Sequence, residues 1–314
     1  MKLWIDTDPG VDDALALLMA FADPHVELVG LGIVGGNVGL DACTRNALKL
    51  CELAGRPLLP VYPGADAPLL PRRAQDAAYW HGRDGFGDVG LRPPGIPAAG
   101  AHAALALIEA SHRHPGELVL LTLGPLTNFA LALALDPGLA ERLAGWTCMG
   151  GAVGARGNTE FLAAEFNLAF DAEAAALCFA RGPALTLVDW ELVLRHGLEL
   201  AEVDGWLSHD AAPARFYRAI SRITRDRHRG EGAGRFTPAD ALAMTVLLEP
   251  DAVLESVTRP VAVETAGALA RGQTVVDWSR RSGRPDNARI VTGIDERAHR
   301  RRLRMALGLE TAPA

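Results

Sequence analysis

The chain has 314 residues, few cysteines, no long apolar run and no excess of basic residues. Its four cysteines lie far apart without a C-x-x-C pair, which favours buried thiols over a zinc site or a disulfide framework. No segment has the ~20 consecutive apolar residues that a membrane span needs, and "MKLWID" does not resemble a signal peptide. A net charge of -7 disfavours nucleic acid polymers, which need a basic surface. We therefore expect a cytoplasmic protein that acts on a small molecule, without a membrane or nucleic acid partner.

The sequence also lacks low-complexity segments, a repeat period and a phosphate-cradling glycine loop of the Walker or dinucleotide kind, so we predict no nucleotide cofactor. What remains is typical of a globular chain, with 49% hydrophobic and 22% charged residues. We predict a single domain over residues 1–314. Near "EGAGRF" the pattern breaks, which predicts a mobile flap at 222–236, and residues 309–314 are expected to form a frayed tail.

Strands and helices alternate along the chain. Apolar runs at "KLWI", "VELVGLGI", "ELVLLTL", "WTCM" and "ALTLV" predict buried strands, and segments of helical periodicity follow most of them. This alternation implies an α/β fold: an open, mostly parallel sheet with helices on both faces and a Rossmann-type core. The polar clusters "DTDPGVDD", "GGN" and "LGPLTN" each follow a strand. Because ligands of such sheets bind outside the carboxyl ends of the strands, these clusters should share one crevice.

The segment "DTDPGVDD" holds four aspartates, Asp6, Asp8, Asp12 and Asp13, between an apolar strand and an apolar helix. Capping of the helix N-terminus explains one or two of them. At the strand end, repulsion between Asp6 and Asp8 would raise their pKa values and cost stability unless a cation is present. Because the cluster has neither histidine nor cysteine, it favours a hard cation such as Ca²⁺ or Mg²⁺.

Together with later motifs, this segment resembles the calcium-dependent nucleoside hydrolases of the inosine-uridine preferring type, which hydrolyse the N-glycosidic bond of ribonucleosides to ribose and a free nucleobase. The resemblance covers roughly residues 3 to 250, and its motifs occur in the order of that family. They are "DTDPGVDDALAL", "VGGN" with "TRNA", "YWHGRDGFGD", "LGPLTNFALAL", "MGGAV", "EFN" and "PADALAM".

The resemblance implies a calcium site and a catalytic pair. Asp8 and Asp13 would bind calcium through their carboxylates, Leu123 through its backbone carbonyl, and Asp240 would complete the protein ligands. Asp8, in contact with both metal and water, is the candidate base, and His81 is the second candidate catalytic residue. The reaction would pass through an oxocarbenium-like state that nearby carboxylates and amides stabilise. The same comparison places the protein in purine and pyrimidine salvage as a homodimer or homotetramer.

The same comparison implies that Asp12, Asn37 and Asn167 hold the sugar hydroxyls, while Glu165 and Asn158 reach the 5′ end. Asn158 stands one residue further from Glu165 than in the family pattern, which weakens its assignment. If Asp12 and Asn37 bind the 2′-hydroxyl, deoxyribosides should be poor substrates.

On the base side we expect Trp80 to stack on the nucleobase, with Arg225 and His228 as further substrate contacts in the flap. Many members of the family carry a histidine directly before the aspartate equivalent to Asp240, where it is thought to protonate the leaving base. Here that residue is Ala239, which has no proton to donate. The preferred nucleobase and the source of leaving-group activation therefore stay open.

Two alternatives remain. A binding protein for nucleosides or ribose could keep the metal site with weak or no turnover, because of Ala239. A haloacid-dehalogenase-like phosphatase, with Asp6 as nucleophile and Mg²⁺ as metal, also begins with D-x-D after a strand, although its further motifs are not convincingly present.

Overall fold

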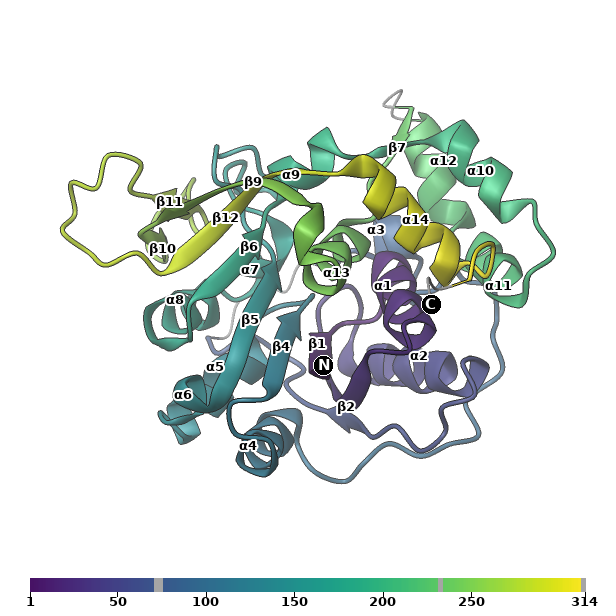
Figure 1. Cartoon of the computed structure of the whole chain (residues 1–314), viewed down its shortest axis with the longest axis horizontal. Helices are drawn as coiled ribbons and strands as arrows, with labels where there is room; N and C mark the ends of the chain where they lie inside the picture. Colours follow the sequence, from purple (N-terminus) through teal and green to yellow (C-terminus); the bar gives the residue numbers. More distant parts are fainter. Residues whose placement is uncertain (71–75, 231–233, 312–314) are drawn as a thin grey trace.

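The computed structural model describes residues 1–70, 76–230 and 234–311. Its centre is an eight-stranded sheet (Figure 1). In spatial order the strands are β3 (Val61–Pro63), β2 (Glu27–Ile33), β1 (Lys2–Thr7), β4 (Leu118–Thr122), β5 (Leu143–Met149), β6 (Leu185–Val188), β12 (Ala288–Ile294) and β9 (Val253–Arg259). All neighbours pair in parallel except β9, which runs antiparallel to β12 at one edge. The predicted mostly parallel α/β sheet is confirmed.

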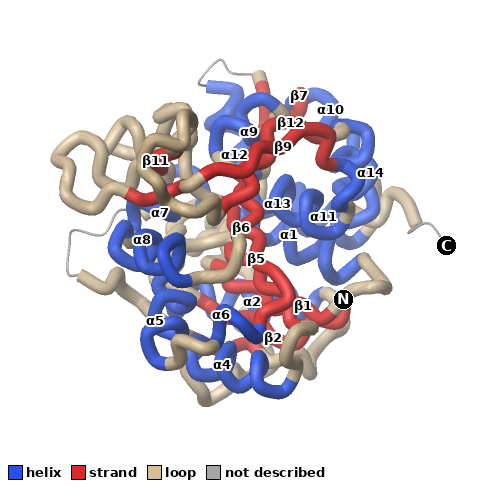
Figure 2. Tube along the Cα trace, turned by 60° about the vertical axis from the view of Figure 1, so that its left-hand side comes forward, coloured by secondary structure: helices blue, strands red, loops and turns tan. Residues whose placement is uncertain are grey.

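Helices cover both faces of this sheet (Figure 2). One core cluster includes side chains of α1 (Val11–Ala22), α2 (Leu40–Leu53), α9 (Trp190–Arg195), α10 (Leu200–Leu207), α11 (Ala212–Ile220), α13 (Ala239–Leu248) and α14 (Glu296–Ala306). The other includes side chains of α4 (Ala103–Arg113), α5 (Thr127–Leu135), α6 (Leu139–Arg142), α7 (Phe166–Phe170) and α8 (Ala172–Arg181). The short elements α3 (Ala78–His81), α12 (Arg222–Gly230) and η1 (Pro250–Ala252) complete the described helices.

The sequence of β1 shows why both faces must be covered. Leu3 and Ile5 belong to the first core cluster, whereas Trp4 between them belongs to the second. Successive side chains of a strand point to opposite faces, so an apolar run such as "KLWI" is stable only when apolar surface meets it on both sides.

The last part of the chain holds features that the sequence analysis did not identify. β12 and β9 extend the sheet at one edge, and two small antiparallel sheets lie outside it: β10 (Val261–Val263) with β11 (Thr274–Val276), and β7 (Leu198–Glu199) with β8 (Arg235–Phe236). Within the described residues, no helix is long and apolar enough to cross a bilayer.

The two segments predicted as a flap and a tail include regular or packed structure. The predicted flap at 222–236 begins as helix α12 and ends in β8, while its residues 231–233 lie outside the described part of the chain. The predicted tail also begins too early, because Leu309 packs against the core and its N–H donates to the Arg304 carbonyl oxygen. Residues 312–314 lie outside the described residues.

Candidate active site

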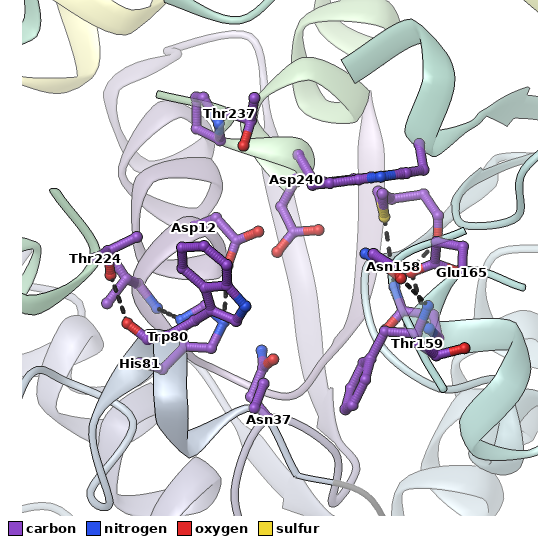
Figure 3. A pocket seen from close by; sticks show the side chains of 18 of the residues that line it. Asp12, Asn37, Trp80, His81, Asn158, Thr159, Glu165, Thr224, Thr237 and Asp240 are labelled. Atoms are coloured by element: carbon purple, nitrogen blue, oxygen red, sulfur yellow. Dashed lines mark hydrogen bonds and ion pairs between the residues drawn. The ribbon is translucent and has the colours of Figure 1, made fainter. Parts of the chain in front are cut away.

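A cavity of about 970 Å³ lies at the carboxyl ends of the central strands, within the size range of small-molecule sites (Figure 3). Leu123 and Met149, at the ends of β4 and β5, form part of its floor, and α3, α12, β8 and the start of α13 supply further walls. The clusters "DTDPGVDD" and "GGN" also reach it through Asp12 and Asn37. The predicted shared crevice is therefore present.

Three carboxylates meet at the wall of this cavity, where Asp12 and Asp240 line it and Asp13 lies buried behind them. Oxygen atoms of Asp12, Asp13 and Asp240 lie within 4.8 Å of one another, an arrangement that could hold a metal ion. Figure 3 shows the carboxylates of Asp12 and Asp240 on the same side of the cavity. Asp12 and Asp13 come from the first turn of α1, and Asp240 comes from the first turn of α13, which packs against α1.

Asp8 lies beside this group in a slot formed by two glycines. A Cβ added to Gly36 would stand 2.2 Å from Asp8 Oδ2, and one added to Gly124 would stand 2.4 Å from Asp8 Oδ1. The Asn37 N–H donates to Asp8 Oδ2 at 2.7 Å. Only glycine at both positions leaves room for this carboxylate, so the turns after β2 and β4 help to position Asp8.

Asp13 is held by donors from three directions. Its Oδ1 accepts from the Thr7 hydroxyl, and its Oδ2 accepts from the Gly10 N–H at 2.9 Å and from Asn37 Nδ2 at 3.0 Å. Asn37 Nδ2 also donates to the Asp8 carbonyl oxygen at 3.1 Å. The side-chain amide of Asn37, in the loop after β2, therefore holds both Asp8 and Asp13.

The electrostatics of the cluster favour a cation. Burial raises the pKa of Asp8 well above its usual value, and the negative charge of Asp13 adds to the shift. Burial, and then the charges of Asp12, Asp13 and Asp8, raise the pKa of Asp240 in the same way. Within the described residues, no lysine or arginine forms an ion pair with any of these four aspartates, and Asp12 Oδ1 is buried without a hydrogen-bond partner. An oxygen-lined anionic site of this kind suits a hard divalent cation.

Amides and a glutamate line the opposite side of the cavity. Asn167 Nδ2 donates to the Leu123 carbonyl oxygen at 2.6 Å, which leaves its Oδ1 for a ligand. Glu165 caps α7 and accepts from the N–H groups of Gly151 and Asn167, both at 2.8 Å. Burial raises the pKa of Glu165 to about 7. Asn158 Oδ1 accepts from the Phe166 N–H, so its amide nitrogen is the group left for a ligand.

His81 stands at the N-terminus of α1, beside Asp12. Its Nδ1 accepts the Val11 N–H at 3.1 Å, so the proton of the neutral ring is on Nε2, which lies 3.9 Å from Asp12 Oδ1. Burial lowers the pKa of His81 to about 4, which keeps the ring neutral near pH 7. The imidazole therefore faces Asp12 as a neutral N–H group.

Aromatic rings form one wall. The ring centroids of Trp80 and His228 lie 5.1 Å apart, and those of His228 and Phe236 lie 5.6 Å apart. The hydroxyl of Thr224, one turn before His228 on α12, donates to the Trp80 carbonyl oxygen at 2.8 Å. This bond ties α12 to α3 and fixes Trp80 relative to His228.

The structure does not bring every predicted residue to the cavity. Arg225 is 8% exposed, and its guanidinium donates to Asp204, the Ser221 hydroxyl and the Arg218 carbonyl. Each of the three guanidinium nitrogens donates to a protein group, and Arg225 does not line the cavity, so its prediction as a substrate contact is not supported. Conversely, the sequence analysis missed Thr224, Phe236 and Thr237, which line the cavity without any motif to mark them.

Asp6 is also remote from the cavity. It is 1% exposed, its carboxylate accepts from Asn128 Nδ2 at 3.1 Å, and burial raises its pKa to about 8. Asp6 is not among the residues that line the cavity, so it is not placed to act as the nucleophile that the phosphatase alternative requires.

Comparison with known proteins gives a consistent result. Residues 3–301 match the family model described as inosine-uridine preferring nucleoside hydrolase. Uridine nucleosidase 1 of Arabidopsis thaliana is 38% identical over 280 residues, which cover 88% of this chain and 82% of the relative. The inosine-uridine preferring nucleoside hydrolase of Leishmania major is 32% identical, with 93% and 92% coverage. A solved inosine-guanosine nucleoside hydrolase superposes with a TM-score of 0.90 at 30% identity, covering 98% of both chains.

Proposed function

The chain belongs to the inosine-uridine preferring nucleoside hydrolase family and hydrolyses the N-glycosidic bond of ribonucleosides, and we propose that it does so with a calcium ion and with Asp8 as the base. The observation that supports this proposal best is the group of buried aspartates at the cavity, which has no cationic partner among the described residues. The haloacid-dehalogenase alternative is not retained.

The residues present fit a hard divalent ion. The carboxylates of Asp8, Asp13 and Asp240 and the Leu123 carbonyl oxygen would hold it. All these donors are oxygens, which suits calcium better than zinc. Asp12 could take part as well, since its Oδ1 lacks a partner and it shares the cluster with Asp13 and Asp240. Bound calcium would lower the pKa of a coordinated water and help to orient the ribose hydroxyls.

The residues around the metal would grip the sugar. Asn37 and Asn167 use their amide nitrogens on the protein, so their Oδ1 atoms accept from ribose hydroxyls. Asp12 accepts from the 2′-hydroxyl, and the His81 N–H helps to orient Asp12. Glu165 and Asn158, on the opposite side of the cavity, face the 5′ end.

The chemistry follows from this placement. Asp8 removes a proton from the attacking water while the water oxygen bonds to C1′ and the C1′–N bond breaks. The Asn37 N–H and the close approach of Gly36 and Gly124 hold the Asp8 carboxylate in one orientation, which a base requires. Carboxylates near the sugar stabilise the positive charge that develops on the ring. Trp80 stacks on the nucleobase. Assembly as a homodimer or homotetramer, a cytoplasmic location and a role in nucleoside salvage remain predictions.

The test measures ribose release by the purified protein with calcium. The substrates are inosine, adenosine, guanosine, uridine, cytidine and a nitrophenyl riboside, with Asp8→Asn as the inactive variant and the exposed Asp41→Asn as the matched control. We expect release from at least one natural nucleoside, lost in Asp8→Asn and retained in Asp41→Asn. Calcium binding without release from any substrate would refute hydrolysis and favour a nucleoside-binding protein instead.

A further inference from the structure

Departure of a nucleobase requires a proton donor on the base side of the cavity. When the C1′–N bond breaks, its electron pair goes to the base, which leaves as an anion unless it is protonated. Ala239 begins α13 at the cavity wall, and its methyl group cannot donate a proton. Any side-chain donor must therefore lie elsewhere on the wall.

Most polar side chains of the wall are already bonded to the protein. The Thr224 hydroxyl donates to Trp80, and the guanidinium of Arg235 donates to the carbonyl oxygens of Gly197 and Arg195. The amides of Asn37 and Asn167 donate to the loops around the metal site. These groups hold the walls in place and are not acids.

The two histidines of the wall differ in their surroundings. His81 receives a backbone N–H on Nδ1 and turns Nε2 toward Asp12, on the sugar side. His228 makes only ring contacts, with Trp80 and Phe236, and within the described residues neither of its nitrogens has a hydrogen-bond partner. It stands against Trp80, the ring expected to stack on the base. A nucleobase beside Trp80 would therefore meet the free imidazole edge of His228.

We propose that His228 is the general acid that protonates the departing nucleobase, in place of the donor that Ala239 cannot supply; this inference rests on the proposed hydrolase function. The proton of the His228 imidazolium forms a new bond to a ring nitrogen or carbonyl oxygen of the base as the C1′–N bond breaks. Asp8 takes the proton of the attacking water. Exchange with solvent then returns a proton to His228 and removes one from Asp8, so one water is consumed per turnover.

Local packing supports this role. Burial lowers the pKa of His228, so a smaller fraction of its rings is protonated near neutral pH, while each protonated ring is a stronger acid. The aromatic rings on its flanks and the Thr224 bond one helical turn earlier restrict its motion. A general acid needs such positioning, and proton transfer of this kind typically contributes about 10²- to 10⁴-fold to a rate.

The test compares two leaving groups in the calcium-loaded protein. Nitrophenolate is stable as an anion, whereas the base of inosine or uridine needs a proton. The variant is His228→Phe, which keeps an aromatic ring between Trp80 and Phe236, and the control is His209→Ala at an exposed position. We expect His228→Phe to lower kcat on the better natural nucleoside by about 10²-fold or more while kcat on nitrophenyl riboside stays within about threefold of wild type.

Three outcomes would overturn the proposal. Equal losses on both substrates would show that His228 only shapes the cavity, and unchanged rates on both would show that it has no role. Wild-type protein that cleaves nitrophenyl riboside alone would show that no acid operates, although the hydrolase function would stand. A wild type inactive on every substrate would instead contradict the proposed function itself.

Discussion

Replacement of Arg225 by alanine separates a structural anchor from a substrate contact. Its guanidinium donates to Asp204, to the Ser221 hydroxyl at 3.2 Å and to the Arg218 carbonyl at 3.0 Å, and thereby joins α12 to α10 and α11. A hydrogen bond from the guanidinium to a carboxylate contributes roughly 1.5–3 kcal/mol, and we take about 0.5–1 kcal/mol for each bond to a neutral acceptor. The Asp204 side chain is 36% exposed and keeps Arg229 as a partner, so the lower value applies to it. We expect Arg225→Ala to lower the free energy of unfolding by about 2.5–3.5 kcal/mol.

Urea unfolding followed by tryptophan fluorescence measures this change. The matched control is Arg222→Ala on the same helix, because Arg222 forms an exposed pair with Asp226 at 3.7 Å and should contribute less than about 0.5 kcal/mol. In the folded state, KM for nitrophenyl riboside should stay within about threefold of wild type in both variants. The reasoning fails if Arg225→Ala unfolds at the wild-type urea concentration while its KM rises more than about tenfold, since that would make Arg225 a substrate contact.

The remaining predictions concern the metal, the sugar and a buried histidine. Calcium at about 100-fold excess over its dissociation constant should raise the free energy of unfolding by about 2.7 kcal/mol, and Asp240→Asn should abolish this gain in calorimetry; an equal gain in the variant would remove Asp240 from the ligands. If Asp12 holds the 2′-hydroxyl, 2′-deoxyinosine should be cleaved about 10- to 100-fold more slowly than inosine, and equal rates would contradict that contact. Burial lowers the pKa of His299 to about 3 in the folded chain. Between about pH 6.5 and pH 3 this histidine is therefore protonated in the unfolded chain but neutral in the folded chain. Stability should therefore fall with decreasing pH by up to about 1.4 kcal/mol per pH unit from this group, and His299→Gln should flatten the curve; an unchanged slope would show that His299 does not carry this effect.

The central sheet was predictable because its strands are uniformly apolar and alternate with helices. Each of the strands β1, β2, β4, β5 and β6 is formed by an apolar run of the sequence. The alternation of such runs with helices implies parallel pairing. The sequence of β9 has no continuous apolar run, because at the sheet edge its side chains are mostly exposed or half-buried. Without an apolar run, neither this strand nor its antiparallel direction could be anticipated.

The residues of the site likewise fall into those that sequence motifs predict and those that only the structure reveals. Asp12, Asp13 and Asp240 stand in distinctive motifs, and the structure brings them together. Arg225 shows the limit of the approach, since a charged residue near a presumed flap looks like a substrate contact until Asp204 is seen beside it. Phe236 is the converse case, because nothing in a two-residue strand indicates that its ring will face a cavity. Such tertiary contacts are not encoded in local spacing.

The packing of α13 against α1 determines when the metal site can exist during folding. Of the proposed ligands, Asp8 and Asp13 belong to the part of the chain that is synthesised first, whereas Asp240 lies on α13, more than 200 residues later. An N-terminal fragment therefore holds an incomplete set of ligands, and closing so long a loop costs entropy before any ion can repay it. Tight metal binding should therefore be among the last events of folding. A bound ion would slow the separation of α13 from α1 during unfolding and would not nucleate folding.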